Sequence, residues 1–223
     1  MVRSARIIKF IEGLTITSGE LAGQPFKLRK WQKDFIRAIY DPVDEDGLRQ
    51  VRTALLTMGR KNGKTTLAAA LVLVHLVGPE NEMRGQVYSA AADRKQSALI
   101  FEEAAAMVRA DPELAAHLHI LGSQKRIVHY PSGSFFVSIP AVERTTHGFN
   151  ASFVVYDELA QAPNRKLFDV LTTSFGARAE PLTVVISTQS PDPHSIMSEI
   201  VDYGEKVRDG VIDDPSFVPA TRP

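Results

Sequence analysis

The stretch 51–77, VRTALLTMGRKNGKTTLAAALVLVHLV, constrains the fold more than any other part of this chain. Residues 51–57 are mostly apolar or β-branched, which predicts a buried strand. Residues 64–77 have the composition of a strong helix, and Gly78-Pro79 ends it. A buried strand that passes through a short glycine-containing loop into a helix is the first half of a strand–helix–strand unit. The stretch therefore predicts a parallel sheet covered by helices.

Other segments continue this alternation. Further strands are predicted at 85–91, 153–156 and 183–188, and further helices at 28–40, 94–110, 166–175 and 195–207. Residues 125–140 alternate around a Pro-Ser-Gly-Ser turn, which predicts a β-hairpin insertion. The fold class is thus α/β, with a doubly wound, mostly parallel sheet. Because the C-terminal tail holds three prolines and no periodicity, we expect one folded domain over 1–204 and a linker over 205–223, before a domain absent from this chain.

Composition limits the possible functions. Apolar residues make up 44% of the 223 residues, enough for a full core, and the absence of cysteine excludes disulfides and fits a reducing cytoplasm. Lys+Arg and Asp+Glu are equal at 26 each, so any nucleic-acid contact must come from a local patch or from several assembled copies. The N-terminus lacks a secretion signal, and the longest apolar run, 67–77, is too short to span a membrane. We therefore expect a soluble intracellular protein.

The loop within 51–77 resembles a phosphate-binding loop. The full pattern is Gly, four residues, then Gly-Lys-Ser/Thr, and its second half is intact as Gly63-Lys64-Thr65. Met58 stands where the first glycine belongs, and Gly59 follows one position late. The alternative is an ordinary turn before a core helix, but the buried strand before it and the helix after it favour a phosphate site.

Each loop residue has a chemical reason to be a candidate. Lys64 would reach the β- and γ-phosphates of a nucleotide, and the Thr65 hydroxyl would hold Mg²⁺. Gly59 and Asn62 can adopt the unusual dihedral angles that the missing glycine would supply. The candidate nucleotide-binding residues here are Gly59, Arg60, Lys61, Asn62, Gly63, Lys64, Thr65 and Thr66.

A phosphate loop predicts a second component, a buried strand that ends in an acid. The segment 153–160, FVVYDELA, provides it. Asp157 can complete the Mg²⁺ shell, whereas Glu158 can orient or deprotonate an attacking water. An Asp-Glu pair can also be a solvated turn, but four apolar residues in front of it argue otherwise. A glutamate beside the aspartate favours hydrolysis over phosphate transfer to a small molecule.

Four segments together resemble a known family: GRKNGKT, LRKWQKDF, HGFNASFVVYDELA and VVISTQS. They are similar to the N-terminal ATPase half of the large terminase subunit of tailed bacteriophages, over nearly the whole chain. The resemblance implies a P-loop NTPase of the additional-strand, catalytic-glutamate (RecA-like) type. It also implies that Trp31-Gln32 contact the adenine base, and that Ser187-Thr188-Gln189 couple hydrolysis to movement. Separately, Gln32 could be a solvated helix residue, Trp31 a core residue, and Ser187 and Thr188 a helix cap.

The same resemblance implies an ATPase with Mg²⁺ that drives viral double-stranded DNA into a procapsid, in the cytoplasm of a bacterial host. Its partners would be the portal protein, the small terminase subunit and further copies of the chain in a ring. Arg144 is the candidate trans-acting arginine and Arg60 the cis-acting one, while Arg94 could contact phosphate or DNA. No nuclease activity is expected from these residues. The alternatives are a superfamily 2 helicase-like motor and a nucleotide-binding assembly module without significant turnover.

Overall fold

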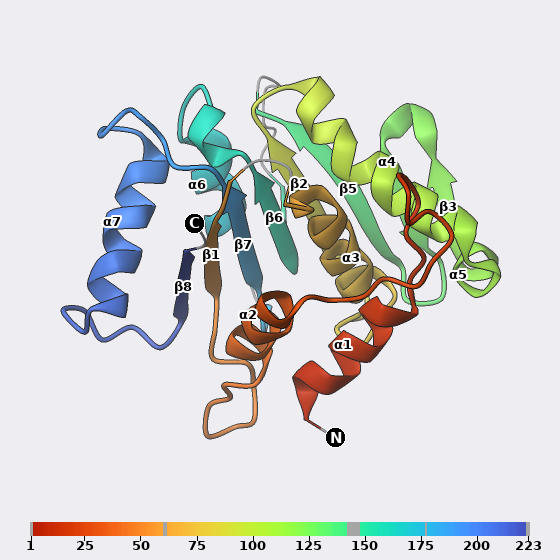
Figure 1. Ribbon diagram of the computed structural model, residues 1–223, viewed down its shortest axis with the longest axis horizontal. Coiled ribbons are helices and arrows are strands. Elements are labelled where there is room, and N and C mark those ends of the chain that lie inside the picture. Colours follow the sequence, from red (N-terminus) through yellow and green to blue (C-terminus); the bar gives the residue numbers. More distant parts are fainter. Residues whose placement is uncertain (1, 60–61, 142–147, 177, 222–223) are drawn as a thin grey trace.

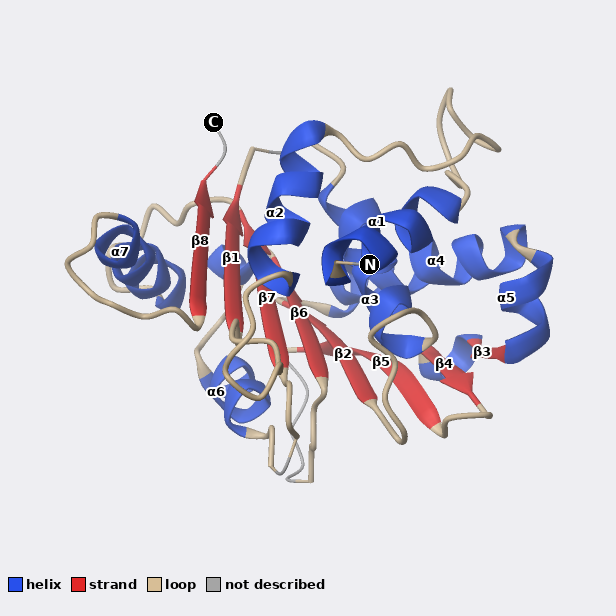
Figure 2. Cartoon of the chain, turned by 90° about the horizontal axis from the view of Figure 1, so that it is seen from below, coloured by secondary structure: helices blue, strands red, loops and turns tan. Residues whose placement is uncertain are grey.

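The computed structural model describes residues 2–59, 62–141, 148–176 and 178–221. They form one eight-stranded sheet with helices on both faces (Figure 1, Figure 2). The strands are β1 (Thr53–Thr57), β2 (Gln86–Ala91), β3 (Leu118–Leu121), β4 (Arg126–His129), β5 (Ser134–Pro140), β6 (Phe153–Asp157), β7 (Leu182–Ser187) and β8 (Phe217–Thr221). The helices are α1 (Arg3–Gly13), α2 (Lys30–Tyr40), α3 (Lys64–Leu76), α4 (Arg94–Ala110), α5 (Pro112–His117), α6 (Lys166–Thr173) and α7 (Ile196–Arg208), with short 3₁₀ turns η1 (Gly122–Gln124) and η2 (Leu159–Gln161).

The strand order is β3-β4-β5-β2-β6-β7-β1-β8. The six strands from β5 to β8 in this order are parallel, and among the described strands the antiparallel pairs are β3 with β4 and β4 with β5. This confirms the predicted mostly parallel α/β sheet. Strand β7 lies between β1, which leads into the glycine loop, and β6, which carries the acid pair. Because the carboxyl ends of parallel strands share one edge, both groups lie at the same edge of the sheet.

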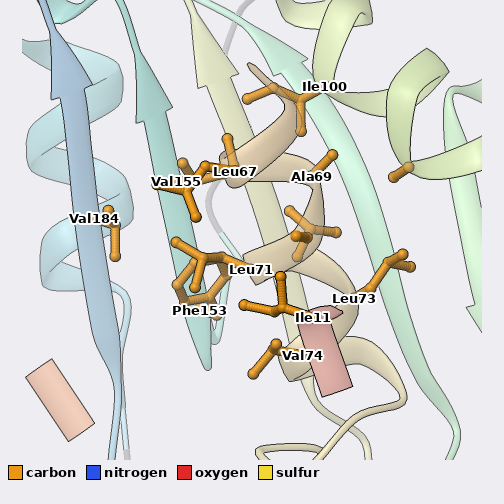
Figure 3. Packing of buried hydrophobic residues seen from close by; sticks show 14 of the residues in the cluster. Ile11, Leu67, Ala69, Leu71, Leu73, Val74, Ile100, Phe153, Val155 and Val184 are labelled. Carbon is orange, nitrogen blue, oxygen red and sulfur yellow. The ribbon is translucent and has the colours of Figure 1, made fainter. Parts of the chain in front are cut away.

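Helix α3 is the centre of the larger core. It is apolar on all sides, as expected for a helix buried between a sheet and other helices. Figure 3 shows Leu67 and Leu71 of α3 against Val155 and Phe153 of β6, all four fully buried. Truncating a leucine in such a position to alanine costs about 2–5 kcal/mol. Within the described residues, no helix combines the length and the apolar character needed to cross a bilayer.

The two faces of the sheet are covered differently. Helices α1 to α4 lie on one face, and α6 lies on the other (Figure 2). A second, smaller apolar cluster packs beneath α6 and α7, from Leu55 of β1, Tyr156 of β6 and Met197 of α7. This doubly covered arrangement explains why β1, β6 and β7 are near-continuous apolar runs, with all but Thr53 of their residues buried.

The C-terminal tail corrects one prediction. Residues 217–221, expected within a linker, form β8 and pair in parallel with β1, so the linker prediction is wrong for this segment. The strand is short and contains Pro219, two features that are typical of loops. Proline is nevertheless tolerated on an edge strand, because its missing N–H leaves no ladder bond broken on the open side.

The N-terminal helix and the hairpin refine the expected fold. Helix α1 was not predicted, although it buries Ile7 and Ile11 against the core. The hairpin over 125–140 is confirmed as β4 and β5. It is also part of the main sheet, since β5 pairs in parallel with β2 and β3 adds one more antiparallel strand outside β4.

A polar cluster lies at the amino ends of the strands, and we name its members Arg3, Arg49, Glu80 and Glu180 the amino-edge cluster. Arg3 forms ion pairs with Glu80 and Glu180, both at 2.5 Å. Arg49 is fully buried and donates to the carbonyl oxygens of Val51 and Glu180. These bonds tie α1 and the segment before β1 to the loops that precede β2 and β7.

His75, near the end of α3, is buried beside this cluster. Its Nε2 lies 2.8 Å from the Tyr40 hydroxyl, and its ring stacks on Phe153 with centroids 4.1 Å apart. Burial, assisted by the positive charges of Arg49 and Arg3, lowers the pKa of His75 well below 6.5. The imidazole is therefore neutral in the folded chain at physiological pH.

Candidate active site

The described residues between β1 and α3 have features expected of a phosphate-binding loop. Gly63 is the N-cap of α3 and has φ 74°, in the left-handed region that glycine enters without strain. Asn62 Nδ2 donates to the carbonyl oxygen of Gly59 at 3.3 Å and so closes the loop on itself. The first-turn N–H groups of α3 have no helical partners, which makes this end of the helix a natural anion site.

Lys64, Thr65 and Thr66 form the first turn of α3. Lys64 is the first helical residue, as predicted, and its ammonium forms an ion pair with Oε1 of Glu158. Both side chains are nearly enclosed, with 9% and 7% of their surfaces exposed. The two threonines are half-buried beside them. The structure thus brings together the two halves of the predicted site, the loop lysine and the acid pair, from positions 94 residues apart.

The acid pair stands at the end of β6. Asp157 is the last residue of the strand and is 2% exposed; Glu158 is 5% exposed. Glu158 has φ 52°, a left-handed conformation that is uncommon for a residue with a side chain. Strain of this kind is often found at functional sites, where the surroundings hold the residue in place.

The end of β7 completes the surroundings of Glu158. The backbone N–H of Thr188 donates to Glu158 Oε2 at 3.3 Å, and the Thr188 hydroxyl donates to the same oxygen at 3.0 Å. The Ser187 hydroxyl accepts from the N–H of Ala160 at 3.1 Å and donates to the carbonyl oxygen of Thr188 at 2.8 Å. Both residues therefore bond to the segment after β6, whereas Gln189 is exposed. We name Lys64, Asp157, Glu158 and Thr188 the carboxyl-edge cluster.

The pKa values of the two acids shift in opposite directions. Burial raises the pKa of Asp157 to about 6, and the neighbouring Glu158 carboxylate adds to this effect. Burial also opposes ionisation of Glu158, but hydrogen bonds from Lys64 and Thr188 outweigh it and lower the Glu158 pKa. Pairs of acids whose pKa values diverge in this way are typical of catalytic sites.

One neighbour of Asp157 was not foreseen from the sequence. Gln96 Nε2, in the first turn of α4, lies 3.5 Å from Asp157 Oδ2. Asp93 is the N-cap of α4, since its side chain accepts from the backbone N–H of Gln96 at 2.9 Å. The signal that could have identified Gln96 is its place in the first turn of the helix that follows β2, at the carboxyl edge of the sheet. Arg94, on the same turn, is exposed.

The two residues predicted to contact the adenine base, Trp31 and Gln32, have structural roles in the chain. The Gln32 side chain is buried and accepts from the backbone N–H of Arg29 at 2.8 Å, which closes the first turn of α2. Trp31 is half-buried, packs against the larger core and lines a cavity of about 200 Å³ with Leu56 and residues 218–220. Three predicted site residues, Arg60, Lys61 and Arg144, lie outside the described residues.

The fold and site together define a class of protein. A strand–loop–helix unit with a lysine at the helix start faces an acid pair across one additional strand, so this is a P-loop NTPase fold of the additional-strand type. The family model for the terminase large subunit, ATPase domain, matches residues 30–206. The chain belongs to this family and is a terminase ATPase domain.

Similar proteins agree with this assignment. The large terminase subunit of Enterobacteria phage HK97 is 39% identical over 213 residues, which span 94% of this chain and 41% of that protein. The crystal structure of the HK97 large terminase matches with a TM-score of 0.85 at 36% identity, over 99% of this chain and 44% of that one. The chain therefore spans less than half of these relatives.

Two more distant structures share the fold. The ATPase domain of the Thermus phage P74-26 large terminase has a TM-score of 0.65 at 19% identity, over 88% of this chain and 81% of that one. The large terminase of another thermophilic bacteriophage, solved in complex with ADP, has a TM-score of 0.54 at 10% identity, over 77% and 40% of the two chains. At these identities, the similarity concerns the fold alone.

Proposed function

We propose that this domain hydrolyses ATP to drive double-stranded DNA into a viral procapsid, in the cytoplasm of a bacterial host. The observation that carries the proposal is the meeting of Lys64 and Glu158 at the carboxyl edge. A lysine there suits the β- and γ-phosphates, and a buried glutamate beside it suits activation of water. The family assignment supports this function over a helicase-like motor.

Each residue of the site takes a distinct role. The loop Gly59 to Thr66 would surround the phosphates, with Gly63 allowing the backbone to turn toward them. Lys64 would bind the transferred phosphate, and Glu158 would accept a proton from the attacking water. Since Thr188 bonds to the Glu158 carboxylate, a change at Glu158 would shift the end of β7. Ser187 and the exposed Gln189 would carry that shift onward, as the coupling role requires.

The residues also suit Mg²⁺. This ion prefers oxygen ligands and is usually held by one or two carboxylates together with substrate phosphates. Among the described residues no group of three or more His, Cys, Asp or Glu side chains could hold a metal, which agrees with such a shared site. Asp157 would supply a carboxylate and Thr65 a hydroxyl. A bound cation would neutralise the phosphate charge and stabilise the ionised form of Asp157, which burial disfavours.

The remaining roles concern partners. Trp31 and Gln32 would touch the adenine base from α2, in addition to their packing and capping roles. Arg60 would act on the phosphates within the same copy, and Arg144 would reach them from a neighbouring copy in a ring. Portal protein and the small terminase subunit would be further partners. Because the chain spans 41% of the HK97 protein, these whole-protein interactions are part of the proposal.

Phosphate release measured against protein concentration tests the function. If neighbouring copies complete each site, specific activity rises with concentration, and duplex DNA raises it further. Activity that stays at the background level at every concentration would instead support an assembly module that binds nucleotide without turnover. The Lys64→Ala variant is the control, since it removes the phosphate-binding ammonium and should show no release at any concentration.

A further inference from the structure

The charges of this neutral chain are unevenly distributed. Residues 1–37 contain eight Lys or Arg and three Asp or Glu, whereas residues 38–223 contain 18 and 23. The first 37 residues thus carry a net positive charge and the rest an equal negative one. In the structure these residues form α1, α2 and the segment between them, on the same face of the sheet as α3 (Figure 1, Figure 2).

Backbone contacts hold the basic segments side by side. The N–H of Phe26 donates to the carbonyl oxygen of Leu14 at 2.8 Å, and the N–H of Leu28 donates to Glu12 Oε1 at 3.3 Å. Lys33 of α2 forms an ion pair with the same Glu12 oxygen at 2.8 Å. The segment before α2 therefore lies beside the C-terminal end of α1.

Some of these cations are neutralised within the chain. Lys30 and Arg37 both pair with Asp34, at 2.9 and 3.0 Å, and Lys33 pairs with Glu12. Four others are exposed and form no ion pair with any residue that the structure describes: Arg6, Lys9, Lys27 and Arg29. We name these four residues the basic ridge.

Acidic residues limit the ridge on one side. Arg6 and Lys9 also line a hollow of about 490 Å³ between α1 and the start of α5, with Asp111 and Glu113 on the opposite wall. The Asp111 carboxylate is used to cap α5, since it accepts from two backbone N–H groups. A negatively charged partner is therefore attracted by the α1 wall of the hollow and repelled by its α5 wall.

We infer that the basic ridge binds the phosphodiester backbone of duplex DNA. Exposed Lys and Arg side chains are the usual phosphate contacts, whereas Lys is depleted in the cores of protein–protein interfaces. Because the whole chain is neutral, this local excess is what makes the attraction possible. The inference rests on the proposed function, since it assigns a surface to the DNA that the motor moves.

The test is the salt dependence of binding to a fluorescent DNA duplex, measured by anisotropy with the full chain. The ridge variant carries Arg6→Gln, Lys9→Gln, Lys27→Gln and Arg29→Gln together. Each lost phosphate contact reduces the slope of log K against log salt by about 1, so the variant should lose about 4 units of slope. The loss should be the same for duplexes of unrelated sequence, because phosphates carry no base identity.

A matched control removes the same charge elsewhere. The variant Arg109→Gln, Lys166→Gln, Lys206→Gln and Arg208→Gln loses four exposed cations outside the ridge. It should keep the slope of the unaltered chain to within about 1 unit. An equal loss in both variants would show that net charge alone governs binding and would overturn the inference, as would a ridge variant with an unchanged slope.

Two further measurements separate folding and catalysis from the ridge. The double variant Lys27→Gln/Arg29→Gln changes only residues before α2, outside both helices, and should lose about 2 units of slope if the fourfold variant does not fold. ATP hydrolysis without DNA should be unchanged in every ridge variant. If the unaltered chain hydrolyses ATP but does not bind duplex DNA, only the inference about the basic ridge is contradicted. If it binds DNA through the ridge without hydrolysing ATP, only the proposed function is contradicted.

Discussion

At the amino edge of the sheet two arginines meet two glutamates, whereas at the carboxyl edge Lys64 faces two acids. Arg3 pairs with both Glu80 and Glu180, and buried Arg49 bonds to main-chain carbonyls, so charge there is balanced. At the carboxyl edge Glu158 takes the ammonium of Lys64, and Asp157 is left with a raised pKa.

The difference distinguishes a structural cluster from a functional one. Buried ion pairs contribute little net stability, but breaking one is costly because it leaves an uncompensated charge. A cluster in which positive and negative side chains are equal in number has no excess charge with which to bind a charged ligand. In the carboxyl-edge cluster the buried acids outnumber the ammonium, beside N–H groups that attract phosphate. The cation of a bound nucleotide can neutralise the excess negative charge of the acids, and the N–H groups can bind the phosphates.

The largest expected effect separates the two edges by catalysis. Glu158→Gln should reduce ATP turnover by about 10²- to 10⁴-fold, because a general base is lost, while binding of a fluorescent ATP analogue persists. At the amino edge, Glu180→Gln should keep turnover of the folded protein within about twofold and lower its stability instead. Turnover near the unaltered level in Glu158→Gln would remove this residue from the mechanism.

The second effect concerns stability. Arg49→Met should lower the free energy of unfolding by about 3–5 kcal/mol, because the carbonyl oxygens of Val51 and Glu180 lose a buried donor and the Glu180 carboxylate loses a neighbouring positive charge. Urea denaturation followed by circular dichroism measures the change. A loss below about 1 kcal/mol would mean that the amino-edge cluster does not contribute substantially to the stability of the fold.

The third effect uses pH, and the two edges should respond with opposite signs. The raised pKa of Asp157 makes its contribution to stability fully present below about pH 3.8 and lost as pH rises through about 6, a difference of roughly 3 kcal/mol. His75 has a lowered pKa, so its contribution is present above pH 6.5 and decreases as pH falls below that value.

Two variants isolate these contributions. Asp157→Asn should stabilise the chain, relative to the unaltered chain, more at pH 7 than at pH 4, because the cost of the buried charge at pH 7 disappears. His75→Gln, which keeps a polar partner for Tyr40, should flatten the decline below pH 6.5. Urea unfolding at several pH values measures both, and parallel profiles for the two variants would contradict the assignment of opposite signs.

The smallest effect lies within the carboxyl edge. Thr188→Val removes the hydroxyl bond to Glu158 but keeps the backbone N–H bond, so turnover should fall about tenfold, as expected for one hydrogen bond to a charged group. Thr188→Ser retains the hydroxyl and should behave like the unaltered chain. A serine variant as slow as the valine variant would show that packing of the threonine methyl group is the cause.

The sequence predicted the carboxyl edge better than the amino edge, for a physical reason. Parallel strands bring their carboxyl ends to one edge, so a loop after 51–57 and acids after 153–156 are expected at the same edge once the sheet is inferred. The amino-edge cluster joins residues as far apart as Arg3 and Glu180, and nothing in local periodicity indicates such contacts. Buried arginines are exceptions to the rule that charged residues are exposed.

The missed elements have their own causes. Strand β8 is five residues long and contains Pro219, so its sequence resembles a loop, and only pairing with β1 makes it a strand. Gln96 reaches Asp157 from a helix whose first turn gives no motif. The ion pair between Lys64 and Glu158 was not predicted, because it depends on the order of the strands and on side-chain positions that the sequence does not reveal.

The contact between Lys64 and Glu158 has a consequence for how nucleotide binding and catalysis would follow one another. On the proposed mechanism, an incoming triphosphate would compete with the Glu158 carboxylate for the Lys64 ammonium, so nucleotide binding would also free the proposed base. In the structure Glu158 accepts on both carboxylate oxygens, from Lys64 on Oε1 and from Thr188 on Oε2. On the proposed mechanism, binding of the nucleotide and release of the base would therefore be coupled through the ion pair between Lys64 and Glu158.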